Sequence, residues 1–245
     1  EIDGRRFIAG ELVSGKSLDK LPRPMPWREA LKLAIGLARG LAAAHRRGVL
    51  HGDIKPANAI LAEDGTVKLV DFGLAQVIDA GGSKREVDHS VVLGTPYYMP
   101  PEAWVAQSLS RRSDVYSMGA LLYELCTGQP PFFGKQPHEI AAHSMRGQIP
   151  PVTSAVADID PRFAEILERC LERLPEQRFA SGEELREALE ELDVASRGTV
   201  IPEGNPYRGL LAFEAAHRAV FFGRDSEIGT ILERLRTDPF VLVAG

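Results

Sequence analysis

Cysteine, long apolar runs and a surplus of positive charge are all scarce or absent in this 245-residue sequence. The two cysteines, Cys126 and Cys170, each lie inside an apolar run of helical character, so we predict two buried thiols in a reducing compartment and no disulfide. No apolar run approaches the roughly 20 residues that a membrane-spanning helix needs. The six histidines are scattered, which argues against a metal site built from clustered Cys and His.

The charge balance argues against a further group of functions. Lys and Arg number 29 against 34 Asp and Glu, which gives a formal net charge of −5. A chain with this balance has no overall positive field that would attract nucleic acid. Hydrophobic residues at 44% and charged residues at 26% are ordinary for a soluble globular protein. We therefore predict a cytoplasmic protein with no membrane segment and no nucleic-acid partner.

We expect the sequence to be a segment cut from a longer protein at both ends. It begins EIDGRR, without an initiating Met or a signal segment, and it stops at VLVAG. Towards the C-terminal end of the sequence, residues 197–206 have the Gly, Pro and Asn content of a linker. The roughly 40 residues after this linker are too few to fold alone without disulfides, a metal ion or partners.

Helices dominate the predicted secondary structure. Residues 27–48 carry apolar side chains at helical spacing over a wide face. Gly36 and Gly40 each cost this helix about 1 kcal/mol relative to Ala, so we expect another element to approach closely at both. Four more helices are predicted, over residues 114–126, 138–147, 161–174 and 181–192.

Two of these helices carry end signals. For the helix over 114–126, Ser113 is the expected N-terminal cap and Gly128 the expected end. One face of this helix is expected to carry Val115, Met118, Leu122 and Leu125. The helix over 181–192 opens with a Ser181-x-x-Glu184 capping box.

Strands are few. Residues 7–15 alternate loosely and predict a strand that runs into a turn. Residues 59–70 form two short β-type runs around Asp-Gly and predict a hairpin. Residues 74–98 are polar and aperiodic and predict a long loop of the kind that is usually functional. The fold class expected from this pattern is α+β and mostly α.

The stretch HGDIKPANAI (51–60) places a carboxylate, an ammonium and an amide on one short segment, at Asp53, Lys55 and Asn58. The predicted hairpin that follows ends in Asp71-Phe72-Gly73, and a hairpin brings its two ends together. Two carboxylates and an amide oxygen are the hard ligands that Mg²⁺ prefers alongside phosphate. Lys55 supplies a mobile positive charge suited to a transferring phosphoryl group.

These residues resemble the catalytic loop and metal-binding segment of eukaryotic-type Ser/Thr protein kinases, written H-R-D-x-K-x-x-N and D-F-G. Three more stretches follow in the family's order and spacing, namely GTPYYMPPE (94–102), SDVYSMG (113–119) and PEQR (175–178). The resemblance covers residues 1–193 and implies the hinge and large lobe of a bacterial kinase, with small β-hairpins. The small lobe, with its glycine-rich loop, lysine and glutamate, would precede Glu1, so we expect the segment alone to be inactive.

The resemblance implies a role for each matching residue in transfer of the ATP γ-phosphate to a protein Ser or Thr. Asp53 would orient and deprotonate the substrate hydroxyl, and Lys55 would steady the γ-phosphate. Asn58 and Asp71 would hold Mg²⁺ between the phosphates. Thr95 matches the threonine that hydrogen-bonds the catalytic Asp and Lys. The substrates implied are proteins with Ser or Thr, the kinase itself among them.

The resemblance also implies an ATP site. Ile60 would pack under the adenine, and the backbone of Glu11 and Val13 would meet its edge. Gly10 would occupy the gatekeeper position and leave an open back pocket. Phe72 is expected in the core.

Four further residues match architectural positions of the family. His51 and Asp114 are expected to hold the catalytic loop. Glu102 and Arg178 are expected to form a buried ion pair.

Gly52 stands where the family has an arginine that receives a phosphate from the activation loop. The glycine removes this docking point and leaves Asp53, Lys55 and Asn58 in register. We therefore predict that phosphorylation of the activation loop, which contains Ser83 and Ser90, does not gate the protein through this contact.

The stretch NPYRGLLAFEAAHRAVFFGRD, with the helix-like and strand-like runs after it, resembles the entry to a STAND-type P-loop NTPase module. Gly245 would be the first glycine of its phosphate loop. We predict a kinase domain over 1–193, a linker over 194–206 and an incomplete α/β NTPase segment over 207–245. A terminal extension of the kinase lobe is the alternative for the last segment. For the whole protein, the alternatives to a Ser/Thr kinase are a pseudokinase scaffold and a regulatory module of a STAND switch.

Overall fold

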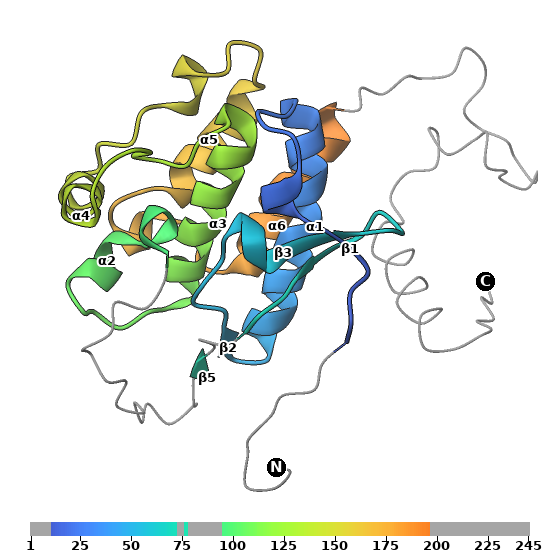
Figure 1. Cartoon of the computed structure of the whole chain (residues 1–245), viewed down its shortest axis with the longest axis horizontal. Helices are drawn as coiled ribbons and strands as arrows, with labels where there is room; N and C mark the ends of the chain where they lie inside the picture. The colour runs from blue at the N-terminus through green and yellow to red at the C-terminus, as the bar shows by residue number, and fades with distance from the viewer. Residues whose placement is uncertain (1–10, 73–75, 78–94, 197–245) are drawn as a thin grey trace, which may run out of the picture. The chain divides into compact units, whose positions relative to one another are not determined.

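The computed structural model describes residues 11–72, 76–77 and 95–196 (Figure 1). The predictions for Gly10, Ser83, Ser90 and residues 197–245 lie outside this range. The described part is a mixed α/β structure, mostly helical, as expected. Its helices are α1 (Trp27–Arg46), α2 (Pro101–Trp104), α3 (Arg111–Thr127), α4 (Pro137–Met145), α5 (Pro161–Cys170) and α6 (Gly182–Ser196).

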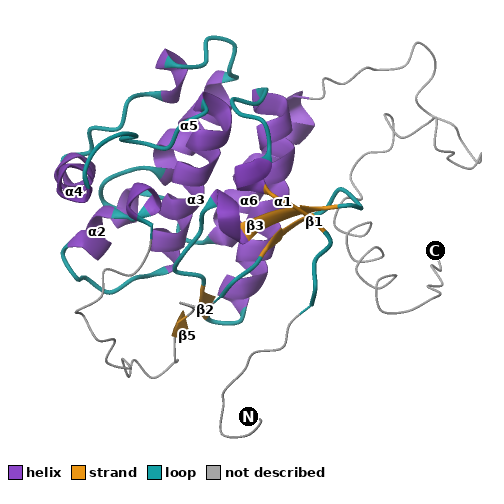
Figure 2. Cartoon of the chain, in the orientation of Figure 1, coloured by secondary structure: helices purple, strands orange, loops and turns teal. Residues whose placement is uncertain are grey.

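The strands form two small sheets. β3 (Ala59–Ala62) and β4 (Val67–Leu69) make the predicted hairpin, and β1 (Gly15–Ser17) pairs antiparallel with β3. The second sheet pairs β2 (Val49–Leu50) with β5 (Gln76–Val77). Figure 2 shows the three-stranded sheet lying against the helices at α1. The sheet therefore rests on the helix that leads, through β2, into residues 51–58.

The hairpin packs on helix α1 at Gly36. A Cβ at Gly36 would lie 2.4 Å from Cγ1 of Val67, so only glycine lets β4 approach this closely. The prediction of close approach is confirmed at this position. It is wrong at Gly40, where a Cβ would meet Cδ1 of Leu69 at 3.9 Å, an ordinary van der Waals contact.

Helix α3 forms the centre of the core. It packs against α1 and α5 (Figure 1), and every residue from Ser113 to Cys126 is buried. The four residues predicted to share one face, Val115, Met118, Leu122 and Leu125, are buried. The rest of this stretch is buried as well, because neighbours on several sides cover the helix, and its polar residues carry bonds of their own. The predicted ends are half right. Gly128 ends the helix at a φ of 87°, but Ser110 is the N-terminal cap, and Ser113 completes its capping box from the N3 position.

Helix α6 begins directly after the predicted serine, Ser181, and continues further than expected. Ser181 Oγ accepts from the backbone N–H of Glu184 at 3.4 Å, but the Glu184 carboxylate accepts from Ala180 at 2.7 Å, one residue before the reciprocal partner of a capping box. The helix runs to Ser196, so the first three residues of the predicted linker are helical. The sequence has no Gly or Pro before Gly198 that would end it sooner.

Two predictions about irregular segments need correction. The described part of the strand predicted over 7–15 is a strand only at Gly15, and β1 continues from there to Ser17, because the pairing with β3 starts at Gly15 opposite Ala62. The segment over 74–98 contains β5 and a 3₁₀ turn, η3 (Pro96–Tyr98), which a polar, aperiodic sequence does not predict.

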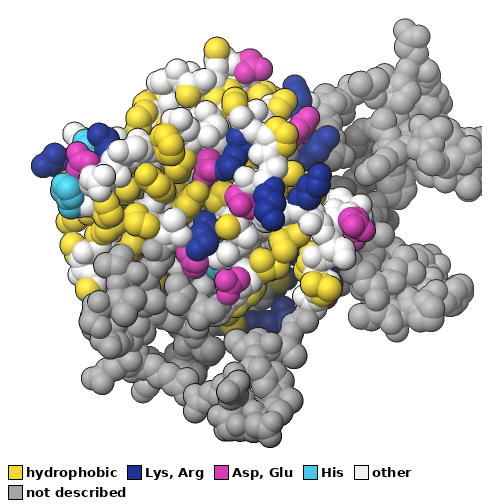
Figure 3. Space-filling model, in the orientation of Figure 1, with side chains coloured by type: hydrophobic (Ala, Val, Ile, Leu, Met, Phe, Trp, Pro, Cys, Tyr) yellow, Lys and Arg dark blue, Asp and Glu magenta, His cyan; other side chains and the backbone are white. Residues whose placement is uncertain are grey.

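Both cysteines are free and buried, as predicted. Burial raises the pKa of each thiol to about 12, so both stay protonated and chemically inert. On the surface, basic and acidic side chains lie interspersed on the face shown in Figure 3. Several pair across α1 and α6, for example Arg39 with Glu190 and Arg46 with Glu183, at 2.8 and 2.7 Å. Among the described residues, no helix is long and apolar enough to cross a membrane.

Candidate active site

The catalytic loop (residues 51–58) connects β2 to β3 and ends in the 3₁₀ turn η2 (Pro56–Asn58). Lys55 Nζ lies 2.5 Å from Asp53 Oδ2 and 3.0 Å from Thr95 Oγ1, so the ammonium bridges two segments that are far apart in the sequence. Asn58 Nδ2 donates to Asp53 O at 2.9 Å and to Asp53 Oδ2 at 3.0 Å. The structure thus brings together Asp53, Lys55, Asn58 and Thr95, four of the residues selected from the sequence.

The hairpin sets the position of Asp71 relative to Asn58. The pairing of β3 with β4 continues one step beyond the strands, because Val70 N donates to Asn58 O at 2.9 Å. Asp71 is the next residue, and its backbone adopts a φ of 61°. A non-glycine residue in this left-handed region is strained, and such strain is concentrated at functional sites. The hairpin therefore brings the Asn58 and Asp71 positions to one end of the sheet, as expected.

The donor set at this end of the hairpin fits a magnesium ion held jointly with phosphate. The Asn58 amide nitrogen faces Asp53, which directs its carbonyl oxygen away from that carboxylate, and Asp71 adds an exposed carboxylate. Within the described ranges, no group of three or more His, Cys, Asp or Glu residues could hold a metal ion alone. Mg²⁺ usually takes one or two protein oxygens and completes its shell with phosphates and water, and this pair can supply the protein's share.

Asp114 on α3 anchors the start of the catalytic loop through its backbone. Its Oδ2 accepts from His51 N and its Oδ1 from Gly52 N, both at 2.9 Å. Gly52 has a φ of 79°, a conformation that costs glycine little and other residues much more. The glycine thus suits the backbone that the anchor requires.

His45 completes this anchor and was not selected from the sequence. Its Nε2 lies 3.0 Å from Asp114 Oδ2, and its Nδ1 accepts from Gly182 N at 3.0 Å. The ring therefore carries its hydrogen on Nε2 and donates it to the carboxylate. His45 links α6 to α3 from the last turn of α1. The only sequence signal was a polar residue at a buried position of an amphipathic helix.

His51 is buried and holds the loop by backbone contacts, as predicted. Nδ1 accepts from Asp53 N at 3.3 Å, and Nε2 faces Val70 O at 3.1 Å, which fixes the neutral ring with its hydrogen on Nε2. Burial lowers the pKa of His51 and outweighs the opposing charge of Asp114. The ring also packs on Phe72, at 4.5 Å between ring centroids. Phe72 itself is 40% exposed, so its assignment to the core was wrong.

Glu102 and Arg178 form the expected buried ion pair. The guanidinium donates to both carboxylate oxygens, at 2.8 and 2.9 Å, and Ser113 Oγ adds a third bond at 2.8 Å. Burial alone would raise the pKa of Glu102, but the bonds and charge of Arg178 lower it overall. The pair fixes α2 to the chain before α6.

A second carboxylate of α3 holds the segment that carries Thr95. Glu124 pairs with Arg23 and accepts from the hydroxyl of Tyr98, and Ser117 Oγ donates to Tyr98 O at 2.8 Å. Burial raises the pKa of Tyr98 to about 12, so the hydroxyl remains a donor. Sequence reasoning missed this set, because Arg23 and Glu124 are 101 positions apart.

The residues expected at the adenine lie on the three-stranded sheet and its lead-in. Ile60 is on β3, opposite Ser17 of β1 and Lys68 of β4. Val13 and Glu11 lie on the segment that enters β1, and the Glu11 carboxylate pairs with Lys68 Nζ at 2.6 Å. The pair is exposed and contributes little to stability.

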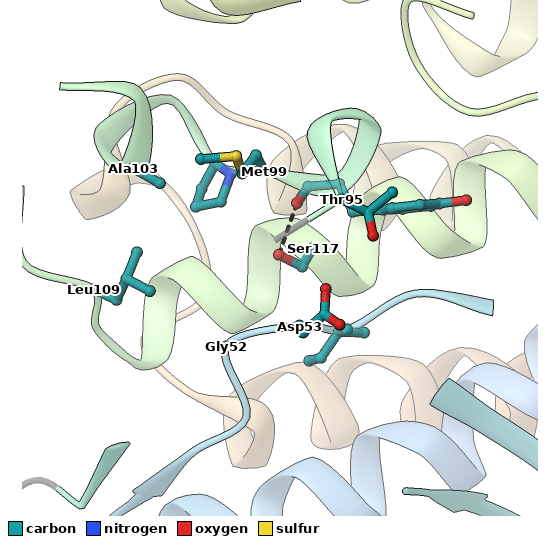
Figure 4. Close-up of a pocket in the computed structure, with 10 residues that line it drawn as sticks. Gly52, Asp53, Thr95, Met99, Ala103, Leu109 and Ser117 are labelled. Atoms are coloured by element: carbon teal, nitrogen blue, oxygen red, sulfur yellow. Dashed lines mark hydrogen bonds between the residues drawn. The ribbon is translucent and has the colours of Figure 1, made fainter. Parts of the chain in front are cut away.

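A small pocket open to solvent lies beside Asp53 (Figure 4). The catalytic loop forms one wall, and η3, α2 and α3 form the others. Its lining residues are Gly52, Asp53, Ile54, Thr95, Tyr98, Met99, Pro100, Ala103, Leu109 and Ser117.

A catalytic loop anchored on a buried helical aspartate, a hairpin that ends in Asp71 and a buried Glu–Arg pair together define a domain of the protein-kinase class. Residues 2–190 match the family described as protein kinase domain, and the chain belongs to this family. Residues 206–245 match the family described as Novel STAND NTPase 1, in agreement with the expected NTPase segment.

Several bacterial relatives resemble the chain. The serine/threonine-protein kinase PknL of Mycobacterium tuberculosis is 37% identical over 198 residues, which cover 78% of this chain and 49% of the relative. PknB of Mycolicibacterium smegmatis is 33% identical over 187 residues, 75% of this chain and 30% of the relative. A probable serine/threonine-protein kinase of Streptomyces coelicolor is 36% identical over 190 residues, 75% of this chain and 28% of the relative. The chain therefore spans about half or less of the length of these curated relatives.

Proposed function

We propose that this chain is the large lobe of a bacterial Ser/Thr protein kinase, which transfers the γ-phosphate of ATP to Ser or Thr hydroxyls of proteins, itself included. The observation that carries the proposal is the bridge by Lys55 Nζ between Asp53 Oδ2 and Thr95 Oγ1, at 2.5 and 3.0 Å. This bridge ties the proposed base to the segment on which a substrate would lie. The names of the relatives, all serine/threonine-protein kinases, support the same activity.

In this proposal each residue has one task. Asp53 accepts the proton of the attacking hydroxyl and orients that hydroxyl toward the phosphate. Lys55 places positive charge where negative charge develops on the transferred group. Thr95 holds Lys55 and Asp53 in register. Asn58 and Asp71 would hold Mg²⁺, which when bound would neutralise the phosphate charge. Ile60, Glu11 and Val13 would contact the adenine of ATP.

The proposed domain boundaries are a kinase domain over 1–193, a linker over 194–206 and the start of a STAND NTPase domain over 207–245. The division of the chain into compact units at residues 1–193 and 194–245 supports the first boundary. We also propose that the protein acts in the cytoplasm.

The test is phosphate transfer from Mg-ATP by the full-length protein, to itself and to a generic basic protein. Asp53→Asn is compared with Asp64→Asn. Asp64 is an exposed aspartate in the turn between β3 and β4. We expect transfer by the wild type and by Asp64→Asn, and its loss in Asp53→Asn. Equal transfer by all three proteins would contradict the assignment of Asp53.

A second candidate function is a nucleotide-binding scaffold or regulatory module of a STAND switch, which the match over residues 206–245 favours. A folded full-length protein that binds ATP but transfers no phosphate would support this candidate over the kinase. ATP hydrolysis that depends on the STAND segment would identify the switch.

A further inference from the structure

Arg23 lies between the 3₁₀ turn η1 (Leu18–Lys20) and α1, and its guanidinium bonds to a buried carboxylate of α3. Nη1 pairs with Oε1 of Glu124, and Nη2 donates to the backbone oxygen of Asp19 at 2.9 Å. The Glu124 side chain is 8% exposed and the Arg23 side chain 20% exposed. The guanidinium therefore fills a site made of one carboxylate and one carbonyl, which solvent reaches along the Arg23 side chain.

The backbone around Arg23 is held by contacts that do not use the Arg23 side chain. Met25 N donates to Leu125 O at 2.9 Å, which ties this segment to α3. Pro24 packs against the end of α3, since a Cβ at Gly128 would lie 3.2 Å from the Pro24 Cδ. An alanine at position 23 should therefore keep the path of the chain and leave the carboxylate site open.

Tyr98 connects this site to the proposed catalytic centre. Its hydroxyl donates to the Glu124 carboxylate, and its backbone N–H donates to Thr95 O at 3.0 Å within η3. Tyr98 and Thr95 also line the pocket beside Asp53. Because an extended peptide advances about 3.3–3.6 Å per residue, a side chain a few residues away from a hydroxyl at Asp53 can reach Glu124.

The burial of Glu124 makes its positive partner important. Removal of one partner of a buried ion pair leaves the other charge without compensation. Among the described residues, Glu124 without Arg23 would keep the Tyr98 hydroxyl as a donor but no cation. A second guanidinium could donate to the carboxylate and to the Asp19 carbonyl together, as Arg23 does. With Arg23 in place, an arginine of a substrate meets a like charge at acceptors that are already bonded.

We infer that Arg23 is a specificity-determining residue, because its guanidinium occupies the position on Glu124 and Asp19 that an arginine of a peptide substrate would otherwise take. The wild-type enzyme therefore gains nothing from arginine near the phosphorylated Ser or Thr. Loss of the Arg23 side chain opens the site to a guanidinium from solution or from a substrate. The consequence for substrate choice rests on the proposed kinase function, whereas the guanidinium site itself does not.

The first test measures binding and needs no phosphate transfer. Methylguanidinium is titrated into full-length Arg23→Ala, and the midpoint of thermal unfolding of the kinase domain is followed. We expect a saturating rise of about 2–4 °C once the ligand exceeds its dissociation constant about tenfold. If Arg23→Ala does not fold alone, methylguanidinium present during refolding should restore the fold. No saturating rise in a folded variant, or no rescue of an unfolded one, would overturn the inference.

Arg39→Ala is the matched control for this test. It also removes an arginine from a carboxylate, but the Arg39 side chain is 64% exposed and its partner Glu190 lies on α6. We expect no saturating rise for Arg39→Ala or for wild type. The same response in Arg39→Ala as in Arg23→Ala would show a general effect of the ligand and overturn the inference.

The second test measures substrate choice by the full-length protein. Two series of peptides carry arginine or glutamine at each position near the acceptor Ser in turn. Wild type and Arg39→Ala should give kcat/KM values within about twofold for arginine and glutamine at every position. For Arg23→Ala, arginine at one position should exceed glutamine by about tenfold or more, because a hydrogen-bonded charge pair forms with a buried carboxylate. Arg23→Ala combined with Glu124→Gln should lose this preference.

A purely structural role of Arg23 predicts a different result. If Arg23 did no more than hold η3 in place, Arg23→Ala would lower kcat/KM for arginine and glutamine peptides by the same factor, and the inference would be overturned. A preference for arginine of about tenfold in wild type would also overturn it. Binding of methylguanidinium by an Arg23→Ala protein whose wild type transfers no phosphate would support the site and overturn the kinase.

Discussion

Gly52 donates its backbone N–H to Asp114 Oδ1 at 2.9 Å from a left-handed backbone with a φ of 79°. This contact explains how a catalytic loop can work with glycine beside its proposed base. The anchor on α3 uses only the backbone of residue 52, and the conformation that it needs is the one glycine adopts most easily. Glycine in place of the family's arginine therefore removes a phosphate-docking side chain and leaves the bonds from His51 N and Gly52 N to Asp114 unchanged.

The first prediction concerns this conformation. Gly52→Ala should lower the free energy of unfolding by about 1–2 kcal/mol, because a Cβ is strained in the left-handed region. Gly40→Ala is the matched control in helix α1, where a Cβ meets only an ordinary contact at 3.9 Å. It should raise the free energy of unfolding by about 0.5–1 kcal/mol. Urea unfolding measures both, and a shift of the same sign in the two variants would contradict the account.

The second prediction concerns the buried ion pair. Glu102→Gln should cost about 3–5 kcal/mol of stability, because Arg178 would remain buried without its counter-charge. The exposed pair of Glu183 with Arg46 provides the comparison, and Glu183→Gln should cost about 1 kcal/mol or less. Chemical denaturation measures the free energy of unfolding of both variants. Costs of similar size would show that burial does not govern the strength of the Glu102–Arg178 pair.

The third prediction concerns pH. Burial lowers the pKa of His51 below its ordinary value of 6.5, against the opposing charges of Asp114, Asp53 and Asp71. The unfolded chain therefore binds a proton in a pH range where the folded chain does not. The stability contributed by the neutral ring is fully present above about pH 6.5 and is lost as the pH falls from there to the folded pKa.

This dependence can be measured as the free energy of unfolding between about pH 7.5 and about pH 5. As the pH falls, the free energy of unfolding should decrease more steeply for wild type than for His51→Gln. The difference between the two slopes should be up to about 1.4 kcal/mol per pH unit. His138→Gln removes an exposed histidine and should keep the wild-type slope. If the slope of His51→Gln matched that of wild type, His51 would not be the group that makes stability depend on pH in this interval.

The fourth prediction follows from the missing arginine. Ser90→Ala and Ser90→Asp should leave the turnover of the full-length kinase nearly unchanged, because position 52 offers no guanidinium to receive a phosphate. Steady-state phosphate transfer tests this. A change of about a hundredfold in either variant would show that the activation loop gates the enzyme through another contact.

Local patterns in the sequence predicted much of this structure. The hairpin over 59–70 follows from two β-type runs around Asp-Gly, and α1 from its apolar spacing. The motifs order Asp53, Lys55 and Asn58 along one loop, and the hairpin brings the Asp71 position to them. These features depend on residues close in sequence or joined by a short turn.

The features that the sequence did not predict depend on contacts between distant residues. Burial of α3 on all sides follows from its position between α1 and α5, which no local pattern specifies. The links of His45 to Gly182 and of Arg23 to Glu124 each span more than a hundred positions. Phe72 was assigned to the core from its motif, whereas its exposure depends on what packs over it.

The central claim is that Asp53 and Lys55 act as one unit in phosphate transfer, as their 2.5 Å contact implies. The most direct measurement is kcat of the full-length protein, of Asp53→Asn, of Lys55→Met and of the double variant, under saturating Mg-ATP and substrate. The account predicts that each single change lowers kcat by at least about a hundredfold and that the double variant is no slower than the slower single variant. A kcat for Asp53→Asn close to wild type, or losses that multiply in the double variant, would contradict it.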